Sequence, residues 1–581
     1  MPSSIETPCI NLHASTKPSS QCVLEKELLS NCGLFTSQSN ATSNSGTRWS
    51  AQTSFFHASK SFFHRRDRRG QTNLTDASLH VAFQRTLSNV EPNRRSDNAA
   101  VPSLRIRPYA FSFDQVELPP IPKVFSPLKD IGPPKFEKVV LPAVLLRVFL
   151  LEDHELGLVG GQLLVKAGSK NDPSNKVGLA TTTSIVQRSG GTRKHPGDIL
   201  DNKLEELAAR IESSSGIAEM SVGFRCLSED LMEVISLFSE VIQMPSMPAS
   251  KLDLARTQLL GSIKRRGDNP GGIAAREFSK LLYGEKSAYS RYFTEDTLRH
   301  IARDDLIVFH ENVFWPTASV LGIWGDFDKD SLKDVIFSKF GSWNASQAQN
   351  GLQDVLVDSF KQWEVGNSFR EPHIYVVNKP GLNQGFVRMG ELGTTVSDPD
   401  VFALDVLNDI LNGFGGLLFD QVRSKEGLAY SVYGGWTPAV EHRGSFLAGG
   451  ETQINTVPQF ILSVEKVLEE VTLKAPSEEE LAKAKEGIIN SFVFNFIDSG
   501  VQLSRIMTYD LYGIDPNFLL NYKKKVEELT SIDILEAAKR HLHPRNQPIL
   551  VVADAARVIP ALKTLGREIV VLHPEYLPET I

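Results

Sequence analysis

The chain has 581 residues, of which 41% are hydrophobic and 23% are charged, and its formal net charge is −7. At about 100–200 residues per domain, this length predicts two to four domains with cores of their own, and the composition excludes a collagenous, coiled-coil or wholly disordered chain. The negative charge offers no basic surplus for a phosphate backbone, so no nucleic-acid partner is expected. The apolar run at residues 139–151 is interrupted by Pro142 and Arg147 and is shorter than the roughly 20 residues that cross a bilayer, so no transmembrane segment is predicted.

The first hundred residues differ in composition from the rest. Up to about residue 70 they are rich in Ser and Thr, hold few acids and end in a basic cluster of Arg65, Arg66, Arg68 and Arg69. This composition is typical of an organellar transit peptide. We favour a plastid over a mitochondrion because Ser and Thr dominate and Arg is scarce near the start. The alternative is a disordered tail without a targeting role.

A proline-rich lead-in at residues 101–136 precedes the folded part, in which hydrophobic periodicity predicts strands and helices. In chain order we expect strands at 144–151 and 162–168, helices at 198–213 and 230–242, strands at 374–377 and 385–389, and a helix at 399–412. Strands grouped with long helices favour an α+β fold with two α/β sandwich domains. Each would be a largely antiparallel sheet covered by helices on one face.

Landmarks that recur at nearly one offset indicate an internal duplication. Leu282-Tyr283-Gly284 recurs 229 residues later as Leu511-Tyr512-Gly513, and Pro316 precedes Asp326 by ten residues just as Pro544 precedes Asp554. A shared offset predicts two homologous domains. We place them at 137–345 and 370–570, with a linker at 346–369 and a tail at 571–581.

Cysteines give no sign of a disulfide framework or of a Cys-based zinc site. Cys9, Cys22 and Cys32 lie in the N-terminal segment, which leaves Cys226 as the single thiol of the folded part. Cys226 lies within an apolar strand-like pattern, which favours a buried small side chain over a nucleophile.

Three segments of the second domain carry a resemblance to a known family. They read Val377-Asn378-Lys379-Pro380-Gly381-Leu382-Asn383-Gln384, Asn408-Asp409-Ile410-Leu411-Asn412-Gly413 and Arg423-Ser424-Lys425-Glu426-Gly427-Leu428-Ala429-Tyr430. Together they resemble the C-terminal domain of the pitrilysin/insulinase family of zinc metallopeptidases, which includes mitochondrial processing peptidase. The resemblance covers roughly residues 134–554. It implies a half-clamshell of two domains whose partner half encloses a peptide-binding chamber.

The catalytic motif of this family, His-x-x-Glu-His, is missing. Residues four apart share a helix face, so two His can bind Zn²⁺ while the Glu activates water. Thr181, Ser184 and Ile185 stand where the motif would be, and the helix expected to supply a third ligand has Ile263 and no acid nearby. The resemblance therefore implies that this chain binds no cofactor itself and that a partner subunit carries the catalytic zinc.

Arg423 and Tyr430 match a pair that, in the family, holds the substrate backbone near the scissile bond. A guanidinium and a phenol both donate hydrogen bonds to a peptide carbonyl that becomes an oxyanion in the transition state. Gly427 is expected to cap the helix that carries Arg423. In the alternative reading, Arg423 pairs with Glu426 or Asp420, and Tyr430 packs as an ordinary strand residue.

Other histidines offer weaker candidates. His541 and His543 form the nearest thing to a cluster, but no carboxylate lies at useful spacing in the sequence, so we expect a helix terminus on the surface. His154 is expected to lie in a loop.

These observations favour a non-catalytic, substrate-binding subunit of a heteromeric zinc metalloendopeptidase, inactive alone, that processes or degrades peptides in an organelle. Its partner would be a homologous subunit carrying His-x-x-Glu-His, and its ligands would be unfolded peptides or presequences. The alternative is a catalytically dead structural or assembly subunit of a larger organellar complex. A third hypothesis, a peptidase that acts alone through an unrecognised metal site, is disfavoured.

Overall fold

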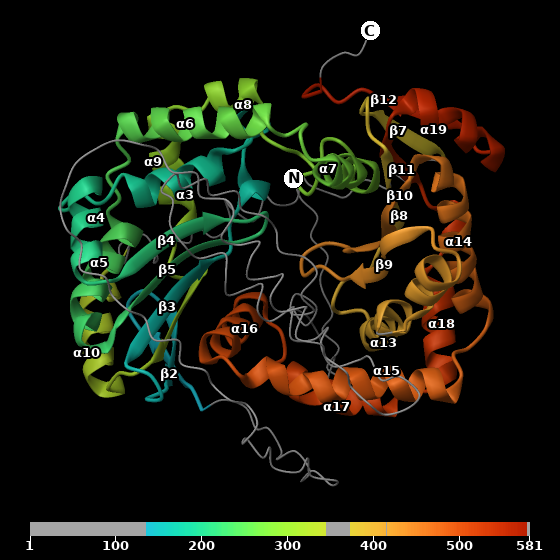
Figure 1. The fold of residues 1–581 in the computed structure, drawn as a ribbon. Coiled ribbons are helices and arrows are strands. Elements are labelled where there is room, and N and C mark those ends of the chain that lie inside the picture. The colour runs from blue at the N-terminus through green and yellow to red at the C-terminus, as the bar shows by residue number, and fades with distance from the viewer. Residues whose placement is uncertain (1–134, 344–371, 414, 578–581) are drawn as a thin grey trace, which may run out of the picture. The chain divides into compact units, whose positions relative to one another are not determined.

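Two six-stranded sheets with their helices make up the described part of the chain (Figure 1). The computed structural model describes residues 135–343, 372–413 and 415–577, and all of them belong to one compact unit. The expected transit peptide, most of the lead-in and the expected linker lie outside the described residues. No helix among the described residues is long and apolar enough to span a membrane.

The first sheet has the strand order β1-β2-β6-β3-β5-β4, in which only the β2–β6 pair is parallel. The elements of this domain are β1 (Glu137–Leu141), β2 (Leu146–Glu152), β3 (Leu158–Val165), α3 (Leu179–Ser189), α4 (Gly197–Glu206), β4 (Arg210–Ser215), β5 (Met220–Leu227), α5 (Leu231–Gln243), α6 (Ala249–Lys264), α7 (Pro270–Tyr283), α8 (Glu295–Arg299), α9 (Arg303–Val313), β6 (Ser319–Gly325) and α10 (Lys329–Phe340).

The second sheet has the order β12-β7-β11-β8-β10-β9, which repeats the first order strand for strand with β12 in the place of β1. Its elements are β7 (Ile374–Asn378), β8 (Gln384–Leu392), α13 (Val401–Asn412), the π-helix η5 (Phe419–Lys425), β9 (Ala429–Thr437), β10 (Ser445–Gln453), α14 (Val457–Leu473), α15 (Glu478–Ser491), η7 (Phe492–Phe496), α16 (Ser499–Tyr512), α17 (Phe518–Glu528), α18 (Ser531–His541), β11 (Ile549–Ala553), α19 (Ala555–Leu562) and β12 (Ile569–Leu572). The equal orders fit the duplication, and the α+β fold class is confirmed.

Helices cover both faces of each sheet, so the expectation of one covered face is wrong. Leu503 and Met507 of α16 pack against Phe149 and Val320 on the first sheet. In the same way α7, from the first repeat, packs on Tyr375, Val377, Leu550 and Val552 of the second sheet. The two repeats therefore exchange equivalent helices. The central strands are apolar on both sides because both of their faces are buried.

The expected helix at 198–213 is wrong in its second half. Helix α4 ends at Glu206, and Ala208 takes a positive φ of 46° before strand β4 begins. Ile211 is fully buried in β4. A single apolar residue of this kind fits either a helix face or a strand face, so hydrophobic spacing could not place the boundary.

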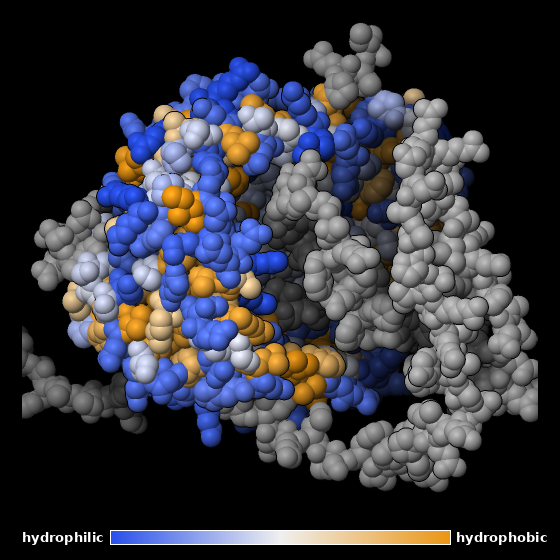
Figure 2. Space-filling view, turned by 60° about the vertical axis from the view of Figure 1, so that its left-hand side comes forward, coloured by the Kyte–Doolittle hydropathy of each residue, from blue (hydrophilic) through white to orange (hydrophobic). Residues whose placement is uncertain are grey.

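The helices of the first domain present a mixed surface (Figure 2). In that view hydrophobic residues lie in small groups among hydrophilic ones. Helices α4, α5, α9 and α10 expose Ile199, Met232, Val308 and Phe337, respectively, one large apolar side chain from each. Scattered apolar side chains of this kind need no binding partner to explain them.

Buried His310 on α9 gives the fold a defined response to acid. Its Nε2 lies 2.8 Å from the backbone oxygen of Ile242, and burial lowers the pKa of His310 to about 4. Because this pKa lies below the ordinary histidine value of 6.5, the native state resists protonation. The corresponding stability is complete above pH 6.5 and is lost as the pH falls from there towards 4. The difference between these two pKa values corresponds to about 3 kcal/mol of unfolding free energy.

A His310→Gln variant keeps a donor for Ile242 and removes the titration. Between pH 7 and pH 4.5 we expect wild type to lose about 2 kcal/mol more unfolding free energy than this variant. Urea unfolding at both pH values measures the difference. Burial raises the pKa of Asp172 to about 6, so its contribution has the opposite sign, but it is common to both proteins. Equal pH dependence in the two proteins would contradict the prediction.

Candidate functional site

Arg423, the first residue of the candidate site, lies in the π-helix η5. In η5 the N–H of Glu426 donates to the oxygen of Gln421 at 3.1 Å, five residues back. The helix is anchored by Val422, which is fully buried in the second core. It ends at Lys425 with Glu426 as the C-cap, and Gly427 follows with a φ of +64°, which glycine adopts without strain. The predicted glycine therefore terminates the helix, from the position after the C-cap. π-helical turns are rare in proteins, and those that do occur are often found at functional sites.

The guanidinium of Arg423 lies between two aromatic rings. Its Cζ atom is 4.6 Å from the centroid of the Phe419 ring and 4.8 Å from that of the Tyr430 ring. Tyr430, the second residue of β9, is 82% exposed. The face of each ring attracts the cation, so the two rings hold the guanidinium beside the exposed phenol.

The donors of Arg423 are not used within the described part of the chain. No described residue accepts a hydrogen bond from this guanidinium or forms an ion pair with it. Glu426, one of the two partners considered above, accepts instead from the amide of Gln421 at 2.5 Å. The alternative in which Arg423 pairs with an acid and Tyr430 is packed is therefore wrong for this structure. The role of the pair in substrate binding stays a prediction.

Helix α13 supports the strand that carries Tyr430. Asn408 donates from Nδ2 to the backbone oxygen of Trp436 at 3.0 Å, and its Oδ1 accepts the N–H of Trp436 at 2.8 Å. One turn later, Asn412 accepts the N–H of Gly434 at 2.9 Å. Strand β9 is at the edge of its sheet, so these amides occupy backbone groups that a neighbouring strand would otherwise pair.

Sequence reasoning missed this support. The available signal was two Asn residues one helical turn apart on a helix whose other residues are mostly apolar.

The positions that the resemblance assigns to the zinc motif lie on α3 and α6, which pack against each other. Ser184 is buried and donates to the backbone oxygen of Ala180 at 3.1 Å. Ile185 and Ile263 pack at the border of the first core, and Thr181 lies on the same helix as Ser184. None of these side chains is a zinc ligand of the usual N, S or carboxylate kind.

An acid, Asp172, lies next to the start of α3. The carboxylate of Asp172 accepts the N–H groups of Gly178 and Ala180, both at 2.8 Å. Burial raises its pKa to about 6. Both carboxylate oxygens are thus engaged in capping the helix.

The surroundings of Cys226 and of His154 indicate no catalytic role for either residue. Cys226 is buried in β5, and burial raises its pKa to about 12, which leaves no nucleophilic thiolate at neutral pH. His154, beyond the end of β2 as expected, meets Asp326 with Nδ1 and Oδ1 2.6 Å apart. Ser228 donates to the other oxygen of the same carboxylate at 2.9 Å. The acid lies between Ser and His, so this group lacks the Ser–His contact of a nucleophilic triad.

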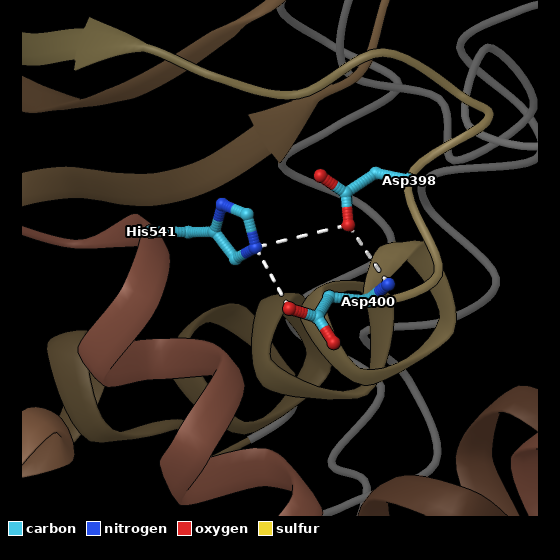
Figure 3. A group of neighbouring side chains, drawn as sticks. All are labelled: Asp398, Asp400 and His541. Carbon is cyan, nitrogen blue, oxygen red and sulfur yellow. Dashed lines mark hydrogen bonds and ion pairs between the residues drawn. The ribbon is translucent and has the colours of Figure 1, made fainter.

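Carboxylates do meet the C-terminal histidines, contrary to the expectation that none lies at useful spacing. Helix α18 ends at His541 as predicted, and Asp398 and Asp400 approach it from the turn before α13 (Figure 3). His543 pairs with Glu391, with Nδ1 and Oε2 2.7 Å apart. The acids precede these histidines by about 140–150 residues, so only the fold brings them together.

Two segments of the chain match known protein families. Residues 147–286 match the insulinase family, peptidase family M16, and residues 300–488 match the peptidase M16 inactive domain. Together the matched segments span more than half of the chain.

Curated relatives include proteins with and without an assigned peptidase activity. The chain is 24% identical over 362 residues to the uncharacterized zinc protease YmxG of Bacillus subtilis, covering 62% of this chain and 84% of that protein. It is 22% identical over 417 residues to the non-peptidase homolog YmxG of Helicobacter pylori, covering 69% and 90%. A shorter match, 19% identical over 225 residues, covers 39% of this chain and 45% of the mitochondrial cytochrome b-c1 complex subunit 1 of Bos taurus.

Solved structures share the fold. The peptidase M16 inactive domain from Pseudomonas fluorescens superimposes with a TM-score of 0.61 at 23% identity, covering 72% of this chain and 98% of that one. The first half of the periplasmic protease PqqL from Escherichia coli gives a TM-score of 0.60 at 14% identity, covering 74% and 97%. The chain therefore belongs to peptidase family M16 and contains both its N-terminal domain and its inactive C-terminal domain.

Proposed function

We propose that this chain is a non-catalytic, substrate-binding subunit of a heteromeric zinc metalloendopeptidase that acts on peptides in an organelle. Its partner would be a family member with an intact His-x-x-Glu-His motif. This chain would contribute Arg423 and Tyr430 to the shared site, and the partner would contribute the zinc and the general base.

The observation that carries the proposal is the guanidinium of Arg423, which lies over two aromatic rings and has no acceptor among the described residues. A peptide carbonyl under attack develops negative charge on its oxygen, and donors already aimed at that oxygen stabilise the transition state most. Contacts with the rings of Phe419 and Tyr430 restrict the position of the guanidinium, which reduces the entropy lost when its N–H groups bind. An exposed Tyr430 hydroxyl would add a second donor.

Zinc-motif positions filled by Thr181, Ser184, Ile185 and Ile263 support a role without catalysis in isolation. A buried Ser and two Ile residues provide neither a ligand nor a base for water. We infer that the purified chain alone does not hydrolyse unfolded peptides, whether or not Zn²⁺ is added.

A second candidate is a structural subunit of a larger organellar complex. The match to cytochrome b-c1 complex subunit 1 favours it, although this match covers less than half of either protein. A scaffold has no use for uncommitted donors at Arg423, and for that reason we place this candidate second.

Isolation of the tagged full chain from its native compartment separates the two candidates. The proposal expects a family member with His-x-x-Glu-His in a stoichiometric complex with it. Stoichiometric partners that include no such member would overturn the proposal in favour of the structural role.

The organellar location makes a separate prediction. A fluorescent protein fused to about the first 100 residues should enter an organelle, with plastids favoured, because the segment is acid-poor, Ser-rich and Arg-bearing. Microscopy of this fusion beside a matched fusion that begins at residue 101 measures the effect. A diffuse cytosolic signal from the first fusion would refute the prediction.

A further inference from the structure

Three potential metal ligands converge where α13 begins and α18 ends (Figure 3). The Nε2 atom of His541 lies 2.8 Å from Oδ2 of Asp400 and 3.8 Å from Oδ1 of Asp398. In Figure 3 the imidazole faces both carboxylates. These side chains are 17–24% exposed, so an ion can reach them from solvent. Among the described residues, no other set of three or more His, Cys, Asp or Glu is close enough to share an ion.

Neighbouring groups hold two of these ligands in place. Oδ1 of Asp398 accepts the N–H of Asp400 at 2.9 Å. Arg540 donates two hydrogen bonds to the carboxylate of Asp400, from Nε at 2.7 Å and from Nη2 at 2.8 Å. Metal ligands in proteins are usually oriented by partners of this kind.

We propose that Asp398, Asp400 and His541 form a site for a borderline divalent cation of the Zn²⁺ type. One imidazole nitrogen and two carboxylate oxygens are ligands that such an ion accepts, at about 2.0–2.2 Å each, which places the ligand atoms about 3–4 Å apart. The measured separations of 2.8 and 3.8 Å fall close to this range. Water would complete the coordination shell. The site departs from our expectation that the chain binds no metal, and it is separate from the lost zinc motif on α3 and α6.

The charge of Arg540 limits the affinity of this site. Its guanidinium offsets one of the two carboxylate charges, so the ion meets a weaker field than in a site with two unpaired acids. We therefore expect an exchangeable ion rather than one that is required for folding. An ion here would join the start of α13 to the end of α18, and Asn408 of α13 bonds to Trp436 of β9, the strand that also carries Tyr430.

The competing explanation is a metal-free staple, by which we mean an ion-paired contact of Asp400 with Arg540 and His541. In it the acidic start of α13 and the basic end of α18 attract each other, and His541 simply donates to Asp400. Both accounts explain the contacts, but only the metal site predicts saturable binding of one ion.

Titration of the chelator-treated full chain with Zn²⁺ by calorimetry, and with Co²⁺ by visible absorption, tests the proposal. Asp398→Asn keeps an acceptor for the N–H of Asp400, and His541→Gln keeps a donor to Asp400, so both should fold. His543→Ala is the matched control, because His543 also pairs with one carboxylate but belongs to no triplet.

We expect one saturable site in wild type and in His543→Ala, with affinity reduced at least about tenfold in Asp398→Asn and His541→Gln. Thermal melts should show Zn²⁺ stabilising wild type and His543→Ala more than Asp398→Asn and His541→Gln. Absence of one-ion binding in wild type, or affinity unchanged in both ligand variants, would overturn the proposal and leave the staple.

Discussion

Replacing Arg423 with Ala in a complex with the zinc-bearing partner is expected to lower peptide cleavage by at least about tenfold, and loss of one oxyanion donor typically costs about a hundredfold to a thousandfold. Tyr430→Phe removes only a hydroxyl and should act in the same direction. The loss should fall on kcat, because these donors act on charge that develops in the transition state. Steady-state cleavage of an unfolded peptide measures it.

Arg423→Lys separates the effect of positive charge from the effect of guanidinium geometry. Its ammonium keeps the charge but cannot reproduce the planar fork that Phe419 and Tyr430 hold, so it should rescue little. Assembly and zinc content of the complex should be unchanged in all three variants. Wild-type rates in both Arg423→Ala and Tyr430→Phe would show that the pair is structural.

Asn408→Leu should lower the unfolding free energy by about 2–5 kcal/mol. The variant leaves both backbone groups of Trp436 without their present partner, and an unpaired buried polar group costs about 1–3 kcal/mol. Trp436 is only 2% exposed, so water cannot readily replace the amide. Urea unfolding measures the change.

Asn412→Ala provides the matched control for this prediction. Asn412 makes the equivalent contact with Gly434, which is buried as Trp436 is, but the Asn412 side chain itself is exposed. Truncation to Ala therefore opens the backbone of Gly434 to water, and the loss should stay below about 1 kcal/mol. If both variants lost the same unfolding free energy, the idea that burial makes the Asn408 contact more stabilising would be contradicted.

The fold was predictable where its evidence is local or repeated. The Leu-Tyr-Gly landmarks mark the ends of α7 and α16, and the equal strand orders of the two sheets reflect the same duplication. The segment from Arg423 to Tyr430 is contiguous, so its arrangement around Gly427 could be expected from one short motif.

Contacts between distant segments were not predictable from spacing. Nothing in the sequence says that α7 packs on the second sheet and α16 on the first, because an apolar helix face is compatible with either sheet. The approach of Asp398 and Asp400 to His541 likewise depends on how α13 and α18 pack. The boundary between α4 and β4 was missed for a local reason, since Ile211 satisfies both periodicities.

The rate of peptide cleavage by the zinc-bearing partner, measured with and without this chain, tests the central claim most directly. We predict that neither subunit alone cleaves an unfolded peptide at an appreciable rate and that the mixture does, with Arg423 intact. A partner that cleaves equally fast without this chain would contradict the account.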